Sequence, residues 1–331
     1  MSHDLIAPSS KSSTWTSWGI SLLNGLVGDY LAGRQNGLAI DMAFYEQNRP
    51  LALAPTALRQ AHPHAGPKIA ILVHGLGCNE GVWTFRDPAQ PETFTSFGVR
   101  LQADLGFTPF SLRYNTGLPV AENGRRLAGL VAQLVACYPQ SIEEIVLIGH
   151  SMGGLVLRSA CFYAAQHGSS WVQQVTHAFY LGSPHDGAYL EKAGHAATRV
   201  LQAIPHPIPR LVGDVFDLRS QGIKDLREGT LVASGDGEAP PAADGEDIPW
   251  LPHVQHHLIN GVLVAGGQHP LGALLGDGLV PPPRDLRQER DDRDAPQRPG
   301  RRLHLIPNVH HLQLVRDPAV YQRIWQACSA A

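Results

Sequence analysis

The sequence is poor in the features that mark several large protein classes. It has only four cysteines, and no two of them form a CxxC motif: Cys78, Cys137, Cys161 and Cys328. We therefore expect free, mostly buried thiols in a reducing compartment, although a disulfide stays open because pairing depends on distance. Lysine is scarce, the formal net charge is −3 and the pI is about 6.6. The basic footprint of a nucleic-acid-binding protein is thus missing, and we expect no nucleic-acid partner.

Long apolar runs are also missing. No stretch reaches the roughly 18 consecutive apolar residues of a membrane span. The first 15 residues are polar and show no basic region followed by an apolar run, which predicts no secretory signal and a cytoplasmic protein. Residues 15–31 have apolar side chains at the spacing of one helical face. We expect a helix packed on the domain, and the alternative is weak peripheral membrane contact.

Apolar runs that end at glycine or proline alternate with segments of helical periodicity. The predicted strands are residues 68–73, 108–114, 144–149, 175–181, 257–265 and 302–306, and the clearest predicted helices are 122–138 and 155–166. Such alternation is typical of an α/β protein with a mostly parallel sheet covered by helices on both faces.

Two segments interrupt this rhythm. Residues 187–254 are first helical and then rich in proline, glycine and acid, which predicts a helical cap or lid insertion. Residues 281–301 are dense in arginine and aspartate and predict a solvated surface loop. We expect residues 1–60 to form an N-terminal helical extension packed on the core, and residues 61–331 to form one domain that carries the cap.

A possible nucleophile stands between the third predicted strand and the helix after it. Gly149-His-Ser151-Met-Gly153 fits the pattern G-x-S-x-G, and this strand–turn–helix setting is the context that the pattern requires. A sharp turn would expose the Ser151 hydroxyl, while the helix N-terminus would face the reacting oxygen. The alternative is a glycine-rich turn in which the serine is incidental.

An activated serine needs a base, and the base needs an orienting carboxylate. In this arrangement the acid follows the serine along the chain, and the histidine comes last. Asp277 fits the acid position in Gly276-Asp-Gly-Leu-Val-Pro. A purely structural turn is the alternative, since aspartate between glycines often caps its own backbone. Asp214 and Asp217 are rivals, but both lie inside the predicted cap.

Two adjacent histidines follow the last predicted strand. His311 opens an apolar run that predicts the start of a helix, whereas His310 closes the loop before it. We therefore favour His311 as the base that takes the proton from Ser151 and returns it to the leaving group. His310 stays open as the alternative.

A tetrahedral intermediate needs two N–H donors aimed at its oxygen. We expect them to be the backbone N–H groups of Met152, after the nucleophile, and of Leu76, in the loop after the first predicted strand. The side chains of these two residues would line an acyl pocket, together with His74, Gly75 and His150. The His74 ring is further expected to bond loop backbone.

Together these segments resemble the α/β-hydrolase lipases and esterases, in particular the bacterial branch similar to triacylglycerol lipases and to the GPI inositol-deacylase-like family. The matching segments keep the family's order: VHGLG (73–77) with Trp83 soon after, GHSMGG (149–154), LGSPHDG (181–187), GDGLVP (276–281) and HHLQL (310–314). The resemblance implies an α/β-hydrolase fold, a triad of Ser151, Asp277 and His311, and no cofactor. The doubled histidine and the insertion before it depart from the family pattern.

The resulting prediction is a serine hydrolase that cleaves carboxylic esters, of small molecules or lipids, through an acyl-enzyme. Thioesterases, amidases and acyltransferases share the same parts, whereas a non-catalytic binding module would be expected to lack one of them. A serine at the turn argues against the aspartate nucleophile of dehalogenases. Five further histidines raise the question of a metal: His62, His64, His253, His256 and His257. Because no HExxH pattern is present, we expect none.

Overall fold

The computed structural model describes most of the chain. The described residues are 11–34, 36–185, 220–222, 225, 231–232, 248–263, 277, 280 and 300–330, with side chains from residue 16 onward. Most of the predicted cap (187–254) and of the predicted loop (281–301) lies outside these residues, as do the rival acids Asp214 and Asp217.

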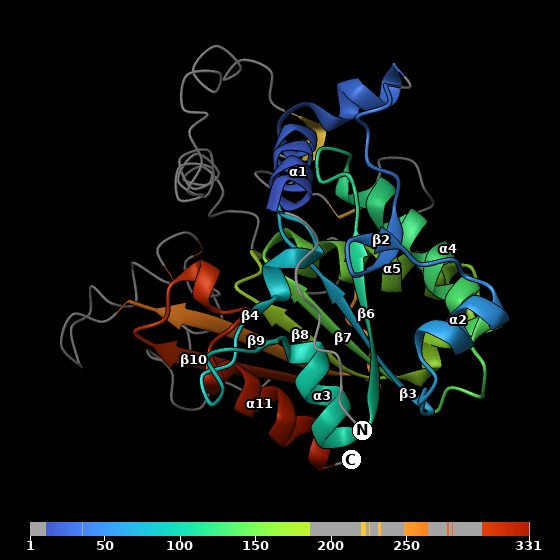
Figure 1. The fold of residues 1–331 in the computed structure, drawn as a ribbon. Helices are drawn as coiled ribbons and strands as arrows, with labels where there is room; N and C mark the ends of the chain where they lie inside the picture. The colour runs from blue at the N-terminus through green and yellow to red at the C-terminus, as the bar shows by residue number, and fades with distance from the viewer. Residues whose placement is uncertain are drawn as a thin grey trace.

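The core is one eight-stranded sheet with the order β10-β9-β8-β7-β3-β6-β1-β2. The strands from β10 to β6 run parallel, and β1 is antiparallel to β6 (Figure 1). Their bounds are β1 Ala43–Glu46, β2 Arg49–Pro50, β3 Lys68–Val73, β6 Phe107–Arg113, β7 Glu144–His150, β8 Val175–Leu181, β9 Gln255–Val262 and β10 Arg301–Pro307. This architecture confirms the predicted fold class.

The central strands are apolar because both faces of the sheet are covered. In β3, Ile69 and Ile71 point into one hydrophobic cluster, and Ala70 and Leu72 point into the other. Successive side chains of a strand point to opposite faces, so a strand that is buried on both faces reads as a continuous apolar run.

Helices form a layer on each face. On one face, α2, α4 and α5 pack against the sheet; on the other, α3 and α11 lie together (Figure 1). The bounds are α2 Pro55–Ala61, α3 Phe97–Leu105, α4 Val120–Cys137, α5 Met152–Gln166 and α11 Pro318–Ser329. Short 3-10 turns and a two-stranded ribbon complete the described elements: η1 Glu80–Trp83, β4 Phe85–Arg86, β5 Phe94–Thr95, η2 Ser170–Gln174 and η4 His311–Gln313. All four cysteines are free.

The β1–β2 hairpin departs from the expectation for residues 1–60, which was a helical extension. These two strands belong to the main sheet, and β1 pairs with β6. The turn between them holds Gln47 and Asn48 at φ values of 49° and 64°, as in the two-residue turns that suit hairpins. A turn without glycine between strands of four and two residues gives little signal in a sequence.

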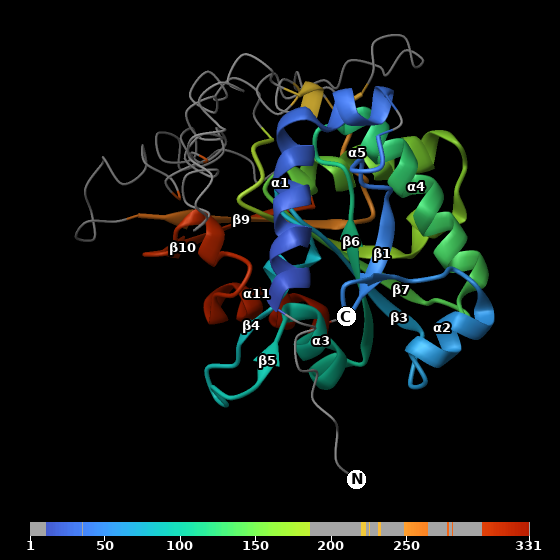
Figure 2. The same ribbon diagram turned by 45° about the horizontal axis from the view of Figure 1, so that its top comes forward.

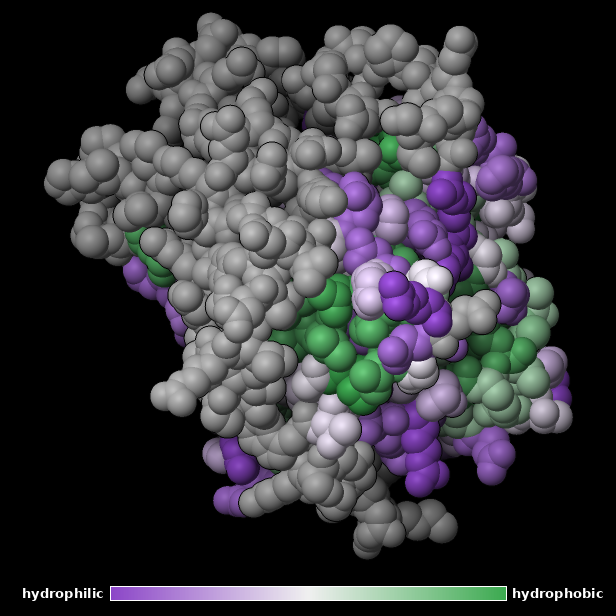
Figure 3. All heavy atoms as spheres, turned by 90° about the horizontal axis from the view of Figure 1, so that it is seen from above, coloured by the Kyte–Doolittle hydropathy of each residue, from purple (hydrophilic) through white to green (hydrophobic). Residues whose placement is uncertain are grey.

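Helix α1 (Lys11–Gly33) agrees with the helix expected over residues 15–31 and covers the molecule above the sheet (Figures 1 and 2). Val27 has non-helical angles (φ −139°, ψ 24°) and kinks it. Seen from above, the surface on this side of the molecule has a cluster of hydrophobic residues next to hydrophilic ones (Figure 3). Among the described helices, none is long and apolar enough to cross a membrane.

Candidate active site

Ser151 forms the sharp turn between β7 and α5. Its backbone has φ 54° and ψ −125°, a region that a residue with a side chain enters only under strain. Two hydrogen bonds hold it there: the Ser151 N–H donates to Leu181 O (2.9 Å) and the Gly154 N–H donates to Ser151 O (3.1 Å). A Cβ on Gly153 would lie 2.2 Å from Val73 O, so only glycine lets the helix start this close to β3.

Asp277 and His311 form a buried pair. The Nδ1–H of His311 donates to Asp277 Oδ2 (2.7 Å), and both side chains are almost fully buried. Because a carboxylate only accepts, this bond assigns the ring proton to Nδ1 and leaves Nε2 as the bare nitrogen. The backbone fixes the pair further, since the His311 N–H donates to Asp277 O (3.1 Å) and the Val280 N–H donates to Asp277 Oδ1 (2.7 Å).

The second histidine of the doublet lies elsewhere. His310 is exposed, and its N–H donates to Gln313 Oε1 (3.2 Å) in the cap of the η4 turn. The structure therefore brings His311, and not His310, to Asp277. His311 begins a single 3-10 turn rather than the expected helix.

The loop after β8 joins the serine to this pair. Leu181 O accepts the Ser151 N–H, and Gly182 follows at φ 60°. A Cβ on Gly182 would lie 2.8 Å from Asp277 Oδ2 and 2.9 Å from His311 Nδ1. Gly182 thus lets the acid and base lie against the strand end that holds the nucleophile. The sequence predicted no role for the LGSPHDG segment. The only sign of the role of Gly182 in the sequence is that a glycine follows an apolar strand.

His150 directly precedes the nucleophile and packs against the base. Its ring centroid lies 4.7 Å from that of His311, and its Nε2–H donates to the His311 carbonyl (3.2 Å). Burial, followed by the charge that His311 can carry, lowers the pKa of His150 well below its ordinary value. His150 is therefore a neutral group that helps to position the His311 backbone.

The β3 loop, residues 74–79, faces the serine from the other side. A Cβ on Gly75 would lie 2.9 Å from Ser151 Cβ. The His74 Nδ1–H donates to Gly75 O (3.0 Å), its ring stacks on Tyr114 at 4.6 Å, and the Tyr114 hydroxyl donates to His74 O (2.9 Å). Burial lowers the pKa of His74 to about 3, so this ring is a neutral structural group that shapes the loop.

Two backbone N–H groups near the serine are candidate oxyanion donors. Within the described residues, neither the Leu76 N–H nor the Met152 N–H donates a hydrogen bond. Met152 is the first residue of α5, where helix N–H groups have no partner inside the helix. Both residues are buried beside the turn.

The histidines of residues 253–257 bond to backbone carbonyls and to other side chains. His253 Nε2 contacts Val172 O (3.0 Å) and His256 Nε2 contacts Leu251 O (3.1 Å). Among the residues that the structure describes, no group of three or more His, Cys, Asp or Glu side chains is arranged to hold an ion.

The sheet order, the antiparallel β1 and the serine turn after β7 define the α/β-hydrolase fold. Residues 115–204, which include that turn, match the model of the PGAP1-like alpha/beta domain family. No curated protein matches the sequence of this chain.

Several solved structures resemble the chain at low sequence identity. A lipase-esterase related protein from Clostridium acetobutylicum is 15% identical, with a TM-score of 0.41, over 79% of this chain and 94% of that one. A Bacillus licheniformis lipase is 14% identical, with a TM-score of 0.48, over 79% and 91%. A Pyrococcus furiosus esterase is 16% identical, with a TM-score of 0.45, over 81% and 83%.

Proposed function

We propose that this chain is a serine hydrolase that cleaves carboxylic esters of small molecules or lipids through an acyl-enzyme. The observation that carries the proposal is the buried Asp277–His311 hydrogen bond, packed on Gly182 next to the Leu181 carbonyl that holds Ser151 in its strained backbone conformation. A base oriented by a carboxylate, next to a serine hydroxyl, is the arrangement that activates serine.

The proposed reaction has two halves. His311 Nε2 takes the proton of Ser151 as Oγ attacks the ester carbonyl, and then gives that proton to the departing alcohol. Water enters, loses its proton to His311 and attacks the acyl-enzyme. The carboxylic acid leaves, and the proton returns to Ser151. In both halves Asp277 stabilises the imidazolium, and the carbonyl oxygen becomes an oxyanion that the Leu76 and Met152 N–H groups can bind.

The family comparison supports the same interpretation, because the matched PGAP1-like alpha/beta domain model spans the serine turn. It does not distinguish esters from thioesters or amides. The acyl pocket proposed around Leu76, Met152 and Gly75 belongs to the same proposal, since these residues adjoin the turn.

The test compares two serine-to-alanine variants on p-nitrophenyl butyrate. We expect Ser151→Ala to lower kcat by about 10⁴-fold or more, whereas Ser141→Ala, at an exposed position after α4, should match the wild type. Equal melting temperatures would show that both variants are folded. Turnover retained by a pure Ser151→Ala preparation would refute the proposed mechanism.

Substrate class is decided by a panel offered to the wild type. Butyryl ester, butyryl thioester and butyramide should be hydrolysed with kcat/KM highest for the ester. A preference for the thioester or the amide, or transfer of the acyl group to an added alcohol faster than to water, would replace esterase with the corresponding alternative.

A further inference from the structure

Helix α1 and the turn between β6 and α4 both contact the β3 loop. The Gly77 N–H of this loop donates to Thr116 Oγ1 (3.1 Å), and both residues are buried. Gly77 has φ 68° and follows Leu76, whose N–H is a proposed oxyanion donor. The hydroxyl of Thr116 therefore fixes the peptide next to that donor.

The backbone of helix α1 packs directly on Gly77 at Gly25. A Cβ on Gly25 would lie 3.0 Å from Gly77 Cα, 3.1 Å from Gly77 N and 3.3 Å from Thr116 Oγ1. With no side chain between the two backbones, a shift of α1 would move the β3 loop directly.

Two further close contacts lock α1 to the turn that carries Thr116. The Asn115 Nδ2–H donates to Gly28 O (2.9 Å), and a Cβ on Gly28 would lie 1.9 Å from Asn115 Oδ1. A Cβ on Gly117 would lie 2.2 Å from Asn24 O. The helix, the turn and the β3 loop thus form one glycine-packed joint.

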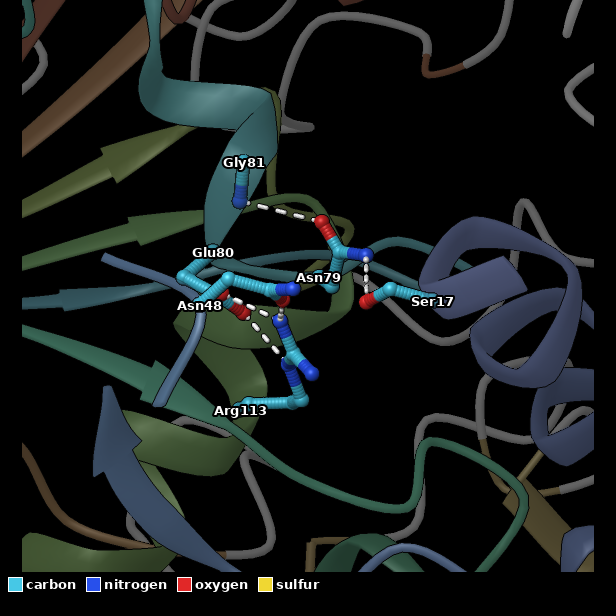
Figure 4. Close-up of polar contacts among 6 residues, drawn as sticks. All are labelled: Ser17, Asn48, Asn79, Glu80, Gly81 and Arg113. Carbon is cyan, nitrogen blue, oxygen red and sulfur yellow. Dashed lines mark hydrogen bonds and ion pairs between the residues drawn. The ribbon is translucent and has the colours of Figure 1, made fainter. Parts of the chain in front are cut away.

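The far end of the β3 loop is tied to the same helix. Asn79 Nδ2–H donates to Ser17 Oγ of α1 (3.2 Å), while Asn79 Oδ1 accepts the Gly81 N–H (3.0 Å) (Figure 4). The loop is therefore held by α1 near both Gly77 and Asn79.

The kink of α1 binds a segment of the predicted cap region. The Ser220 N–H donates to Leu26 O (3.0 Å), and its hydroxyl donates to Gly25 O (2.8 Å). The Gln221 N–H donates to Asp29 Oδ2 (2.8 Å). The kink at Val27 directly follows these two carbonyls, so α1 contacts this segment with the same turn that packs on Gly77.

We propose that Gly25 and Thr116 are positioning residues that hold the β3 loop in the conformation in which the Leu76 N–H can bind the oxyanion. This inference rests on the proposed esterase function and assigns part of the site to the N-terminal helix. Neither residue touches the reacting atoms, and both act through Gly77.

The first test makes the same substitution twice in one helix. Gly25→Ala places its Cβ against Gly77, whereas a Cβ at Gly19 would have nothing within 4 Å and serves as the matched control. Alanine favours helix over glycine at both positions. We expect Gly25→Ala to lower kcat about tenfold or more with little change in KM, since losing one oxyanion donor costs about 10²–10³-fold. Gly19→Ala should keep the wild-type kcat.

The second test removes one hydroxyl. Thr116→Val keeps the shape of the side chain but loses the acceptor for the Gly77 N–H, and Thr116→Ser restores it. We expect Val to lower kcat and Ser to recover most of it. Butylboronic acid, which forms a tetrahedral adduct on an active serine, should bind Gly25→Ala and Thr116→Val at least about fivefold more weakly, because it uses the oxyanion donors.

Amide hydrogen exchange in residues 74–79 separates this inference from the proposed function, since it needs no catalysis. Faster exchange in Gly25→Ala and Thr116→Val than in Gly19→Ala would support the positioning role. Unchanged exchange would overturn it. It would also be overturned if the wild type is active and both variants keep its kcat and its boronate affinity. A wild type without esterase activity would instead overturn the proposed function.

Discussion

His310 and His311 are neighbours in the sequence but have different surroundings. The ring and the backbone N–H of His311 both bond to Asp277, whereas His310 is exposed. The strand β10 ends at Pro307, and Asn308 follows with φ 60°. That left-handed residue turns the chain between β10 and the 3-10 turn in which His311 meets Asp277.

Substituting each histidine separately tests this choice. We expect His311→Gln to lower kcat on p-nitrophenyl butyrate by at least about 10³-fold, because glutamine cannot take the serine proton. His310→Gln should remain within about threefold of wild type. Steady-state kinetics of both variants, with circular dichroism to check folding, give the answer. A larger loss in His310→Gln would reassign the base.

The sequence predicted the candidate residues Ser151, Asp277 and His311 better than the residues that surround them. Ser151 has a local pattern, and the acid and base follow from chain order, so each could be named from the sequence alone. Gly182 and Thr116 could not, because their importance lies in contacts with Asp277, His311 and Gly77 that are distant in sequence. The catalytic roles themselves stay predictions.

At the scale of elements, a partly buried ion pair ties the β1–β2 hairpin and η1 to β6. Arg113 of β6 donates from Nε to Glu80 Oε2 (2.6 Å) and also contacts Asn48 of the hairpin turn (Figure 4). The two charged side chains are only 11% and 12% exposed. Removing one partner from such a site leaves the other charge partly buried and without its partner.

We expect Arg113→Met to lower the free energy of unfolding by about 3 kcal/mol. The double variant Arg113→Met/Glu80→Gln should lose less than the sum of its single changes. The control is Arg126→Met, which breaks an exposed i,i+4 pair with Glu122 on α4 and should cost only about 0.5 kcal/mol. Urea denaturation measures every variant, and equal losses at Arg113 and Arg126 would contradict the argument.

Elements with strong local signals were predicted closely. The expected strands over residues 68–73 and 175–181 match β3 and β8 at both ends, since continuous apolar runs bounded by turn residues leave little choice. Helix α5 begins at Met152, three residues before the expected start, because the tight turn fixes Gly153 and Gly154 in the helix despite their low propensity. Tertiary contacts, which are invisible in a local pattern, set that boundary.

At the scale of the whole molecule, several histidines are buried or half-buried, and burial lowers their pKa values. His177, His257 and His304 bond to one another across β8, β9 and β10, with N···N distances of 3.1 and 3.2 Å. Burial lowers the pKa of His257 to about 3, and its histidine neighbours contribute to that shift. The pKa of His74 is likewise lowered to about 3 and that of His256 to about 4, in both cases chiefly by burial.

These depressed pKa values predict an acid-sensitive fold. Above the unfolded-state pKa of about 6.5, these rings are neutral in both the folded and the unfolded protein, so they do not change the free energy of unfolding. As the pH falls below about 6.5, the unfolded chain gains protons that the native state cannot accept until the pH nears 3 to 4. Each such histidine removes about 1.4 kcal/mol of stability per pH unit in that window.

Urea denaturation at pH 7.5, 6.0 and 5.0 measures this loss. We expect the free energy of unfolding of the wild type to fall steeply below about pH 6.5, and His257→Gln to show a shallower slope because one proton is removed from the linkage. Glutamine can still donate to one neighbouring ring and accept from the other, so the substitution keeps the three-residue chain across the strands. Identical slopes for wild type and variant would mean that His257 is protonated in the native state, contrary to its burial between β8 and β10.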